Sequence, residues 1–410
     1  MNTIILHRAP WIIPISKPVL IDGAVAVKNG RILDVGPFLE QRNRYPEAQI
    51  SEHTDCALLP PLVNAHIHLE LSHIRIAEDN EPVTGFTNWI GKLLATREHA
   101  GAVGKAAENA ARETLKQQFE LGVIGIGDIG NTDIGENLTE EFPGTLMHFH
   151  EVLGRSQKSR KSILAKVAEA DDTKRFTAHA PYSTHAELIQ SIKKRARRLG
   201  HPFPIHTAEP PSENELLSTG SGELFEFLVQ RGFIDNSYQP PAGIDNQGSV
   251  QYLHALGVLD EQTICVHCVH VNDEEIQMLA ESKTRVCLCP GSNRFLHVGR
   301  APVRKFLDHG ILPALGTDSR ASNPEISIWR EMQLLSRDNH DVQQSDILAM
   351  ATLGGARALG IEHDHGTLEK GKKAQFLAVK LPDNVRTAEK LVDYLATDNS
   401  MIKPVWINEK

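Results

Sequence analysis

The order of apolar and polar residues changes character along the chain. Between residues 58 and 318, short runs of apolar residues alternate with longer segments in which apolar residues recur every three or four positions. Such runs are typical of buried strands, and the longer segments of helices that cover a sheet. The strands are expected at 58–66, 123–128, 145–152, 175–180, 203–207, 263–267, 284–289 and 311–318. Eight strands alternating with helices predict an α/β fold, and within it a (β/α)8 TIM barrel.

The helical pattern is clear in the segments between these strands and continues after the last one. Helices are expected at 104–121, 162–170, 186–199, 222–231, 274–282, 326–335 and 346–359, the last interrupted by Gly354-Gly355. Asn272-Asp273, just before the fifth of them, is a typical helix cap. These positions are therefore read as structural.

Both ends of the chain have a different, β-rich pattern. Short apolar runs at 4–6, 24–28 and 32–35 are separated by the turn signals Asp22-Gly23 and Asn29-Gly30. Another such run, 375–379, follows Gly371. We therefore expect a small β-sandwich domain built from both termini. The predicted division is 1–57 and 366–410 for that domain and 58–365 for the barrel.

Composition and charge exclude several classes of protein. The 410 residues carry a formal net charge of -9 with no long basic run, so neither nucleic acid nor an anionic membrane is an expected partner. No apolar stretch approaches the ~20 residues that span a bilayer, and no signal peptide is evident, which favours the cytoplasm. The five cysteines are too few for a disulfide framework and are expected to be reduced. A homodimer is the expected assembly if the chain associates.

Polar side chains with metal-binding chemistry follow several of the predicted strands. His66 and His68 stand two residues apart at the end of the first strand, so both side chains point to the same side. Later strands end in His179, His206 with Glu209, His267 and Asp318. Because the carboxyl ends of barrel strands meet at one rim, these groups should converge there. Histidine nitrogens with one carboxylate oxygen suit zinc or ferrous iron, which predicts a metal site.

Two other clusters compete with this prediction. Cys265-x-x-Cys268 with Cys287-x-Cys289 offers four thiolates, but the second spacing is better explained by alternation on a buried strand. His148-x-His150 repeats the spacing of the first pair and is expected to line the barrel or its core. His270 is a candidate for contact with the site from a loop. None of these replaces the rim cluster.

The motifs taken together resemble the amidohydrolase superfamily. The resemblance rests on His66-x-His68, His179, His206 with Glu209, His267, and Gly316-Thr317-Asp318, together with 290–293 and the tail 366–372. Within the superfamily, the chain is similar to the aminohydrolase branch of nucleoside, nucleobase and s-triazine deaminases and chlorohydrolases. The stretches 64–72 and 86–90 look most like aminodeoxyfutalosine deaminases of the alternative menaquinone route.

This resemblance implies roles for the matching residues. It implies one divalent metal, zinc with iron as the alternative, held by His66, His68, His206 and Asp318. A single metal also agrees with the segment 175–180, which contains neither lysine nor an acid that would bridge two ions. Glu209 would shuttle protons, His267 would orient the attacking water, His179 would contact the substrate, and Asp318 would also accept the proton of that water. The implied reaction is hydrolytic deamination by metal-activated hydroxide with release of ammonia.

Residues that would contact the substrate are less sharply indicated by the sequence. Glu70 would bind a ribose hydroxyl or a ring edge, or else be solvated or cap a helix; Trp89 would stack on a base or simply pack. Arg155 is the first choice for a substrate carboxylate, with Arg294 and Arg300 as alternatives.

The expected partner is a small purine-type molecule, and 6-aminodeoxyfutalosine is the favoured substrate. Adenosine, S-adenosylhomocysteine, methylthioadenosine and guanine are alternatives, as is an s-triazine that loses chloride. A catalytically inactive barrel that serves as a binding subunit is the alternative from another class of protein.

Overall fold

Two parallel sheets form the centre of the protein. In the computed structural model, residues 3–76, 85–234, 248–397 and 402–409 are described. The first sheet has the order β6 (Leu62–Ile67), β7 (Val123–Gly130), β8 (Thr145–Val152) and β9 (Phe176–Ala178). The second has the order β10 (Phe203–Thr207), β11 (Thr263–His267), β12 (Arg285–Leu288) and β13 (Ala314–Leu315). The predicted α/β class is confirmed, and each of the eight predicted strand segments overlaps one of these parallel strands.

The edges of the two sheets are joined by backbone hydrogen bonds at both sides. The amide of His206, in β10, donates to the carbonyl of His179, just after β9, over 3.0 Å. On the other side, the amide of Thr317 donates to the carbonyl of His66, in β6, over 2.9 Å. These contacts bring the carboxyl ends of β6, β9 and β10 and the residues after β13 close together.

Two predicted strands differ from those observed, and prolines explain both differences. The run 58–66 is divided at Pro60-Pro61 into β5 (Cys56–Leu59) and β6, which belong to different sheets. Proline has no backbone N–H to donate to a ladder, so a continuous central strand cannot pass through this pair. The predicted strand 311–318 is reduced to β13, which starts directly after Pro313.

Helices connect the strands, and each of the seven predicted helical segments overlaps at least one of them, while several shorter helices were not predicted. Those before β11 are α1 (Phe38–Arg44), the 3₁₀ turn η1 (Leu69–Leu71), α2 (Phe86–Ala100), α3 (Lys105–Glu120), α4 (Ile134–Asn137), α5 (Gln157–Glu169), α6 (Ala186–Leu199), α7 (Pro211–Thr219), α8 (Glu223–Gln230) and α9 (Ser249–Ala255). Those after it are α10 (Asp273–Glu281), α11 (Pro290–Phe295), α12 (Val303–Asp308), α13 (Ile328–Asp338), α14 (Gln344–Ala349), the π-helical turn η2 (Met350–Gly354), α15 (Gly355–Leu359) and α16 (Ala388–Thr397). The π-helical turn ends at Gly354, at the glycine pair that the sequence marked as an interruption.

The cap predicted before α10 is also confirmed. The side chain of Asn272 accepts a hydrogen bond from the amide of Glu275, and Glu275 in turn accepts from the amide of Asn272. This reciprocal pair satisfies two amides at the start of the helix.

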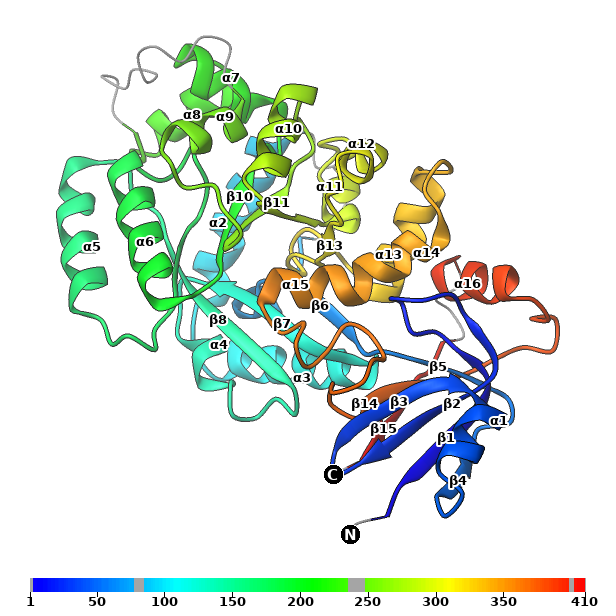
Figure 1. Ribbon diagram of the computed structural model, residues 1–410. Coiled ribbons are helices and arrows are strands. Elements are labelled where there is room, and N and C mark those ends of the chain that lie inside the picture. The colour runs from blue at the N-terminus through cyan, green and yellow to red at the C-terminus, as the bar shows by residue number, and fades with distance from the viewer. Residues whose placement is uncertain (1–2, 77–84, 235–247, 398–401, 410) are drawn as a thin grey trace.

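Both chain ends meet in a third, mixed sheet. Its order is β15 (Val405–Asn408), β14 (Gln375–Lys380), β5, β1 (Ile5–Ile12), β2 (Leu20–Lys28) and β3 (Arg31–Pro37), with β4 (Gln49–Glu52) also paired to β1. Figure 1 shows this sheet with both termini at one end of the molecule. Strands from both chain ends share this sheet, whereas the predicted domain division and the sandwich form stay predictions.

Three glycines allow β6 to pack tightly between its neighbours. A Cβ atom on Gly127, in β7, would lie 2.5 Å from the carbonyl oxygen of Ala65, and one on Gly316 would lie 2.7 Å from the Cβ of His66. A Cβ on Gly355, in α15, would lie 2.6 Å from the Cβ of Val63. These distances are too short for real side chains, so glycine at these positions lets the strand that carries His66 sit where it does.

Two further expectations concern the membrane and the cysteines. Among the described residues, no helix is both long and apolar enough to cross a membrane. All five cysteines are free thiols, and four of them are buried.

Candidate active site

Four of the expected residues place their binding atoms together at the carboxyl ends of the strands. The Nε2 atoms of His68 and His206 are 3.3 Å apart. Oδ1 of Asp318 lies 3.6 Å from Nε2 of His66 and 3.5 Å from Nε2 of His68. The side chains come from β6 and the residue that follows it, from β10, and from the segment after β13. The fold therefore brings together residues from distant parts of the chain, between positions 66 and 318.

The surroundings of these side chains fit a metal ion. Neither ring nitrogen of His66 has a hydrogen-bond partner, although the side chain is fully buried. Burial lowers the pKa of His66 and His206, and it lowers that of His68 to about 4, so the three imidazoles are neutral. Neutral histidines with free buried nitrogens are what a divalent cation needs as ligands.

Asp318 completes the set as an anion. Burial opposes its ionisation, but its contact with His66 and the polar imidazoles of His68 and His267 nearby outweigh burial and hold its pKa well below the usual value. Its Oδ2 accepts hydrogen bonds from the hydroxyls of Ser292, over 2.6 Å, and Ser322, over 2.9 Å. Those two bonds leave Oδ1 directed at the histidines.

Two backbone conformations at the site are strained. His267 has φ 74° and Asp318 has φ 57°, in the left-handed region that residues with a Cβ seldom adopt. Such residues cost about 1–3 kcal/mol each and persist where the surroundings fix them. Both strained residues belong to the set that the sequence singled out.

Glu209 and His267 lie beside the cluster, on its inner side. Oε1 of Glu209 is 3.6 Å from Nε2 of His267, and these atoms and the Asp318 carboxylate form one close group. Nδ1 of His267 donates to Oδ1 of Asn293 over 2.8 Å, which fixes the ring with Nε2 toward Glu209. Burial and the charge of Asp318 raise the pKa of Glu209 well above the usual value, so its carboxyl can carry a proton.

His179 also lies at the cluster. Its ring centroid is 4.8 Å from that of His206, and its Nδ1 is 2.7 Å from the hydroxyl of Ser183. Its backbone carbonyl accepts a hydrogen bond from Nδ1 of His206 over 2.8 Å. Since Nδ1 of His206 is used in this way, Nε2 is the nitrogen left for the cluster.

The predicted substrate contacts Glu70 and Trp89 are both engaged within the protein. Glu70 is buried, accepting from Arg97 over 2.9 Å and from the amide of Thr132 over 2.8 Å, so the alternative of a solvated side chain is wrong. The indole of Trp89 donates to the carbonyl of Ala321, in the segment after Asp318, over 3.0 Å. Glu70 thereby links the segment after β6 to α2 and to the residues after β7. Trp89 links α2 to the segment after Asp318.

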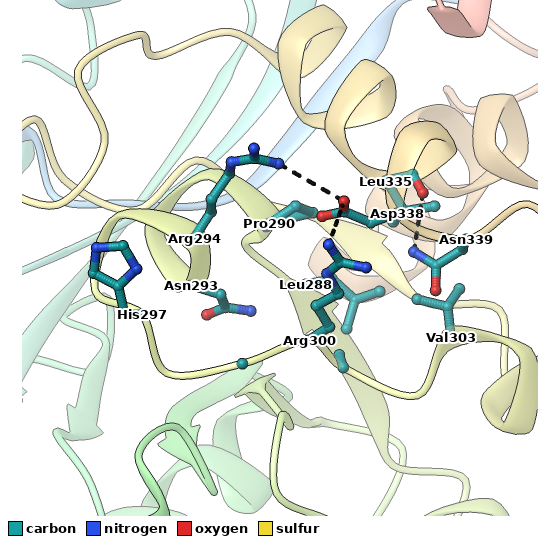
Figure 2. A pocket seen from close by; sticks show the side chains of 12 residues that line it. Leu288, Pro290, Asn293, Arg294, His297, Arg300, Val303, Leu335, Asp338 and Asn339 are labelled. Atoms are coloured by element: carbon teal, nitrogen blue, oxygen red, sulfur yellow. Dashed lines mark hydrogen bonds and ion pairs between the residues drawn. The ribbon is translucent and has the colours of Figure 1, made fainter.

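The three candidate arginines occupy two different places. Arg155 donates to the carbonyl of Pro181, two residues after His179, over 2.6 Å. Arg294 and Arg300 instead pair with Asp338, at 3.7 and 3.1 Å, across a pocket of about 380 Å³ between α11, the following loop and the end of α13 (Figure 2). Arg155 is therefore the candidate beside the histidine cluster.

Several buried carboxylates of the site were not singled out from the sequence. Glu151, at the end of β8, places Oε1 3.8 Å from Nδ1 of His206, and burial together with the charge of Glu70 raises its pKa to about 8. Asp128, in β7, accepts a hydrogen bond from the amide of Leu69 over 2.8 Å, next to His68. Their position near the ends of predicted strands is the signal that could have found them.

The competing clusters do not form metal sites in the structure. Among the described residues, no group with metal-binding spacing contains more than one cysteine. His148 lies 2.7 Å from Oδ2 of Asp128, while His150 lies 3.0 Å from the ammonium of Lys166. His270 is 2.6 Å from the carbonyl of Val298 and is held there.

The buried pair of His148 and Asp128 leads to a pH-dependent prediction. Burial lowers the pKa of His148, but the hydrogen bond and charge of Asp128 outweigh burial and raise it above 6.5. A raised pKa contributes stability that is fully present below about pH 6.5 and is lost as the pH rises through the folded value. We expect His148→Leu to cost about 3 kcal/mol at pH 6 and less at pH 9, measured by urea unfolding.

The neighbouring histidine provides the control. Burial, together with the charge of Lys166, lowers the pKa of His150 to about 4, so this side chain is neutral at both pH values. The cost of His150→Leu should therefore be the same at pH 6 and pH 9. Equal costs at the two pH values for His148→Leu as well would contradict a charged His148.

A comparison with known proteins decides the family. The sequence profile described as the amidohydrolase family matches residues 57–408. This chain belongs to the amidohydrolase family. The amidohydrolase is 29% identical to 5-methylthioadenosine/S-adenosylhomocysteine deaminase of Moorella thermoacetica, over 92% of this chain and 86% of that one. It is 27% identical to aminodeoxyfutalosine deaminase of Nitratiruptor sp., over 97% of both chains.

A solved structure shares the fold over the whole amidohydrolase. Helicobacter pylori aminofutalosine deaminase, in complex with methylthio-coformycin, superposes with a TM-score of 0.82 at 22% identity and covers 98% of this chain and 100% of its own. Together with the family match and the deaminase relatives, the site makes the amidohydrolase a hydrolase that acts on carbon–nitrogen bonds.

Proposed function

We propose that this amidohydrolase is a metal-dependent deaminase that replaces an exocyclic amine of a purine-type nucleoside by oxygen and releases ammonia. The observation that carries the proposal is the placement of Glu209, His267 and Asp318 in one close, buried group beside three neutral histidines. Breaking an amidine C–N bond by water needs a group that takes a proton from the water and one that protonates the ring. Both kinds of group stand here within a few ångströms.

The proposed architecture is a closed (β/α)8 barrel with a small β-sandwich domain. It is supported by the backbone hydrogen bonds that join β9 to β10 and the end of β13 to β6. The proposed domains are 58–365 for the barrel and 1–57 with 366–410 for the β domain. In this arrangement the histidine cluster lies at the barrel rim where active sites are found.

The proposed ligands of one divalent metal are His66, His68, His206 and Asp318. Zinc is the preferred ion, with iron as the alternative, because three imidazoles and one carboxylate suit either. When bound, such a metal lowers the pKa of a coordinated water toward neutrality.

The side chains around that position divide the remaining chemistry. Asp318 accepts a proton from the attacking water, and His267, held by Asn293, orients that water through Nε2. The carboxyl of Glu209 donates its proton to the ring nitrogen as the water oxygen adds to the amidine carbon. Glu209, now a carboxylate, takes the remaining proton of the water from the new hydroxyl and passes it to the amine, which leaves as ammonia. The proton held by Asp318 then returns to Glu209 and restores the starting state. His179, beside His206, contacts the substrate.

6-Aminodeoxyfutalosine is the substrate that we propose first, because the Nitratiruptor relative matches the chain over its full length. Its use would place the enzyme in menaquinone biosynthesis. Arg155 would meet the carboxylate of this substrate, and Glu70 and Trp89 would line the same side. The Moorella relative favours methylthioadenosine or S-adenosylhomocysteine as the second candidate.

An ammonia-release screen with zinc-loaded protein tests the proposal. The substrates are a 5′-carboxyphenyl nucleoside, methylthioadenosine, S-adenosylhomocysteine, adenosine, guanine and an s-triazine. We expect the carboxyphenyl nucleoside to have the highest kcat/KM, and Arg155→Ala to lower that value by about 10-fold or more. Arg155→Ala should leave adenosine deamination nearly unchanged. The control variant Arg112→Ala removes an exposed arginine paired with Glu141, and it should also leave adenosine deamination nearly unchanged.

The other outcomes separate the alternatives. Preference for methylthioadenosine, S-adenosylhomocysteine, adenosine or guanine would move the assignment to that substrate, and release of chloride to a triazine hydrolase. No reaction with any compound while metal is bound would contradict deamination and favour a binding subunit. A homodimer and a cytoplasmic location stay predictions.

A further inference from the structure

A buried acid outside the site described above connects two of its loops. Glu331, in α13, is fully buried and has no arginine or lysine partner among the described residues. Its Oε2 accepts a hydrogen bond from the amide of Gly291 over 2.7 Å, and its Oε1 accepts one from the side-chain amide of Asn323 over 2.6 Å. Gly291 follows β12 and Asn323 follows β13, so one carboxylate holds two neighbouring strand ends.

The residues next to these two contacts hold the proposed catalytic groups. Ser292, directly after Gly291, donates to Oδ2 of Asp318, and Asn293 accepts from His267. On the other loop, Ser322 donates to the same Oδ2. Asn323 itself also donates to the carbonyl of Thr317, one residue before Asp318, over 2.8 Å.

The backbone of Gly291 packs closely against Glu331 and Asn323. A Cβ atom on Gly291 would lie 2.5 Å from both Oε1 of Glu331 and the side-chain nitrogen of Asn323. The two residues held through these loops, His267 and Asp318, both have a positive φ, as do Ala208 and Cys268 beside them. Strained residues persist only where their surroundings fix them, and the Glu331 contacts provide such fixing.

We propose that Glu331 is a positioning residue that fixes Asp318 and His267 relative to each other and so sets the affinity of the metal site. The proposal rests on the assignment of Asp318 as a ligand in the proposed function. Groups that hold ligands from behind commonly change metal affinity or activity by 10–100-fold when they are replaced. Glutamine is the informative replacement, because its NH2 group would face either Gly291 or Asn323, both of which are donors.

Zinc affinity of Glu331→Gln is the main measurement, obtained by competition of the metal-free protein with a chromophoric chelator. We expect affinity to fall by about 10-fold or more and kcat to fall similarly, with KM within about threefold of wild type. Metal affinity does not depend on which compound is the substrate. A failure of the deaminase proposal would therefore leave this measurement intact.

Glu275 offers a matched control. It is a second buried carboxylate that accepts hydrogen bonds from backbone amides, those of Asn272 and Val250, beside a tightly packed Gly248. Among the described residues, its hydrogen bonds go to Asn272, Val250 and Gln251, none of which is a proposed ligand or is bonded to one. Glu275→Gln should lower the melting temperature about as much as Glu331→Gln does, yet leave zinc affinity and kcat within about twofold of wild type.

A control on α13 itself is provided by Asp338. This residue joins the same helix to the loop after β12, through the partly exposed Arg294 and Arg300 (Figure 2). Exposed ion pairs contribute little, so Asp338→Ala should also leave zinc affinity unchanged. The proposal would be overturned if Glu331→Gln and Glu275→Gln both bound zinc as tightly as the wild type. It would also be overturned if Glu331→Gln, Glu275→Gln and Asp338→Ala lost zinc affinity equally. If Glu331→Gln does not fold, Glu331→Asp replaces it in the comparison of zinc affinities, because aspartate keeps the carboxyl group on a shorter side chain.

Discussion

Glu209→Gln is expected to lose about a thousandfold in kcat while it keeps its metal. Glutamine has the shape of glutamate but cannot carry a proton to the ring nitrogen and then to the leaving amine. Proton transfer by a positioned side chain is worth about 10²–10⁴-fold in rate. The loss should be measured as steady-state ammonia release, and the metal content by atomic absorption on the same samples.

Glu213 provides the control for this prediction. It is buried four residues further along, its pKa is raised by burial to about 7, and it accepts hydrogen bonds from Ser249 and from the amide of Glu209. Glu213 does not reach the His267 group. Glu213→Gln should therefore lower kcat by less than about a tenth of the factor by which Glu209→Gln lowers it. A Glu209→Gln enzyme that keeps more than a tenth of wild-type kcat would contradict the proton-shuttle role.

His66→Ala is expected to abolish both metal binding and activity. His66 is the ligand with two free buried nitrogens, and its removal leaves two histidines and a carboxylate to hold the ion. We expect zinc affinity to fall by at least about 100-fold. Chelator treatment of the wild-type protein should remove activity equally, and zinc should restore activity to the wild type but not to the variant.

His150→Ala is the matched variant for this experiment. His150 belongs to the second His-x-His pair, in β8, and lies near Lys166 and away from the proposed ligands. It should retain one full equivalent of zinc and most of its activity. A full equivalent of zinc in His66→Ala, bound as tightly as in the wild type, would show that the metal is held elsewhere.

Apolar runs and strand-end positions were enough to predict much of the fold and the core of the site. Alternation places His66 and His68 on one side of β6, and the parallel topology then brings His206 and Asp318 to the same end. Pro60-Pro61 signals a division of the first predicted strand, because proline interrupts a ladder. The prediction of one strand over 58–66 followed the long apolar run and overlooked this signal.

Other residues could not be assigned from the sequence because their roles depend on contacts between distant segments. Glu331 lies in the first turn of an amphipathic helix, where a glutamate ordinarily faces solvent, and the packing of α13 on two loops buries it. Glu70 was expected to face the substrate, to be solvated or to cap a helix, and its pairing with Arg97 from α2 was not foreseen. Single carboxylates have no periodic signature, so their partners emerge only in three dimensions.

The central claim is that three histidines and one aspartate from distant parts of the chain hold one divalent metal. Crystals of the zinc-loaded protein, measured at the zinc absorption edge, test this directly. We expect one anomalous peak per chain, about 2.0–2.2 Å from Nε2 of His66, His68 and His206 and from Oδ1 of Asp318. A peak at other side chains, or no peak after zinc loading, would contradict it.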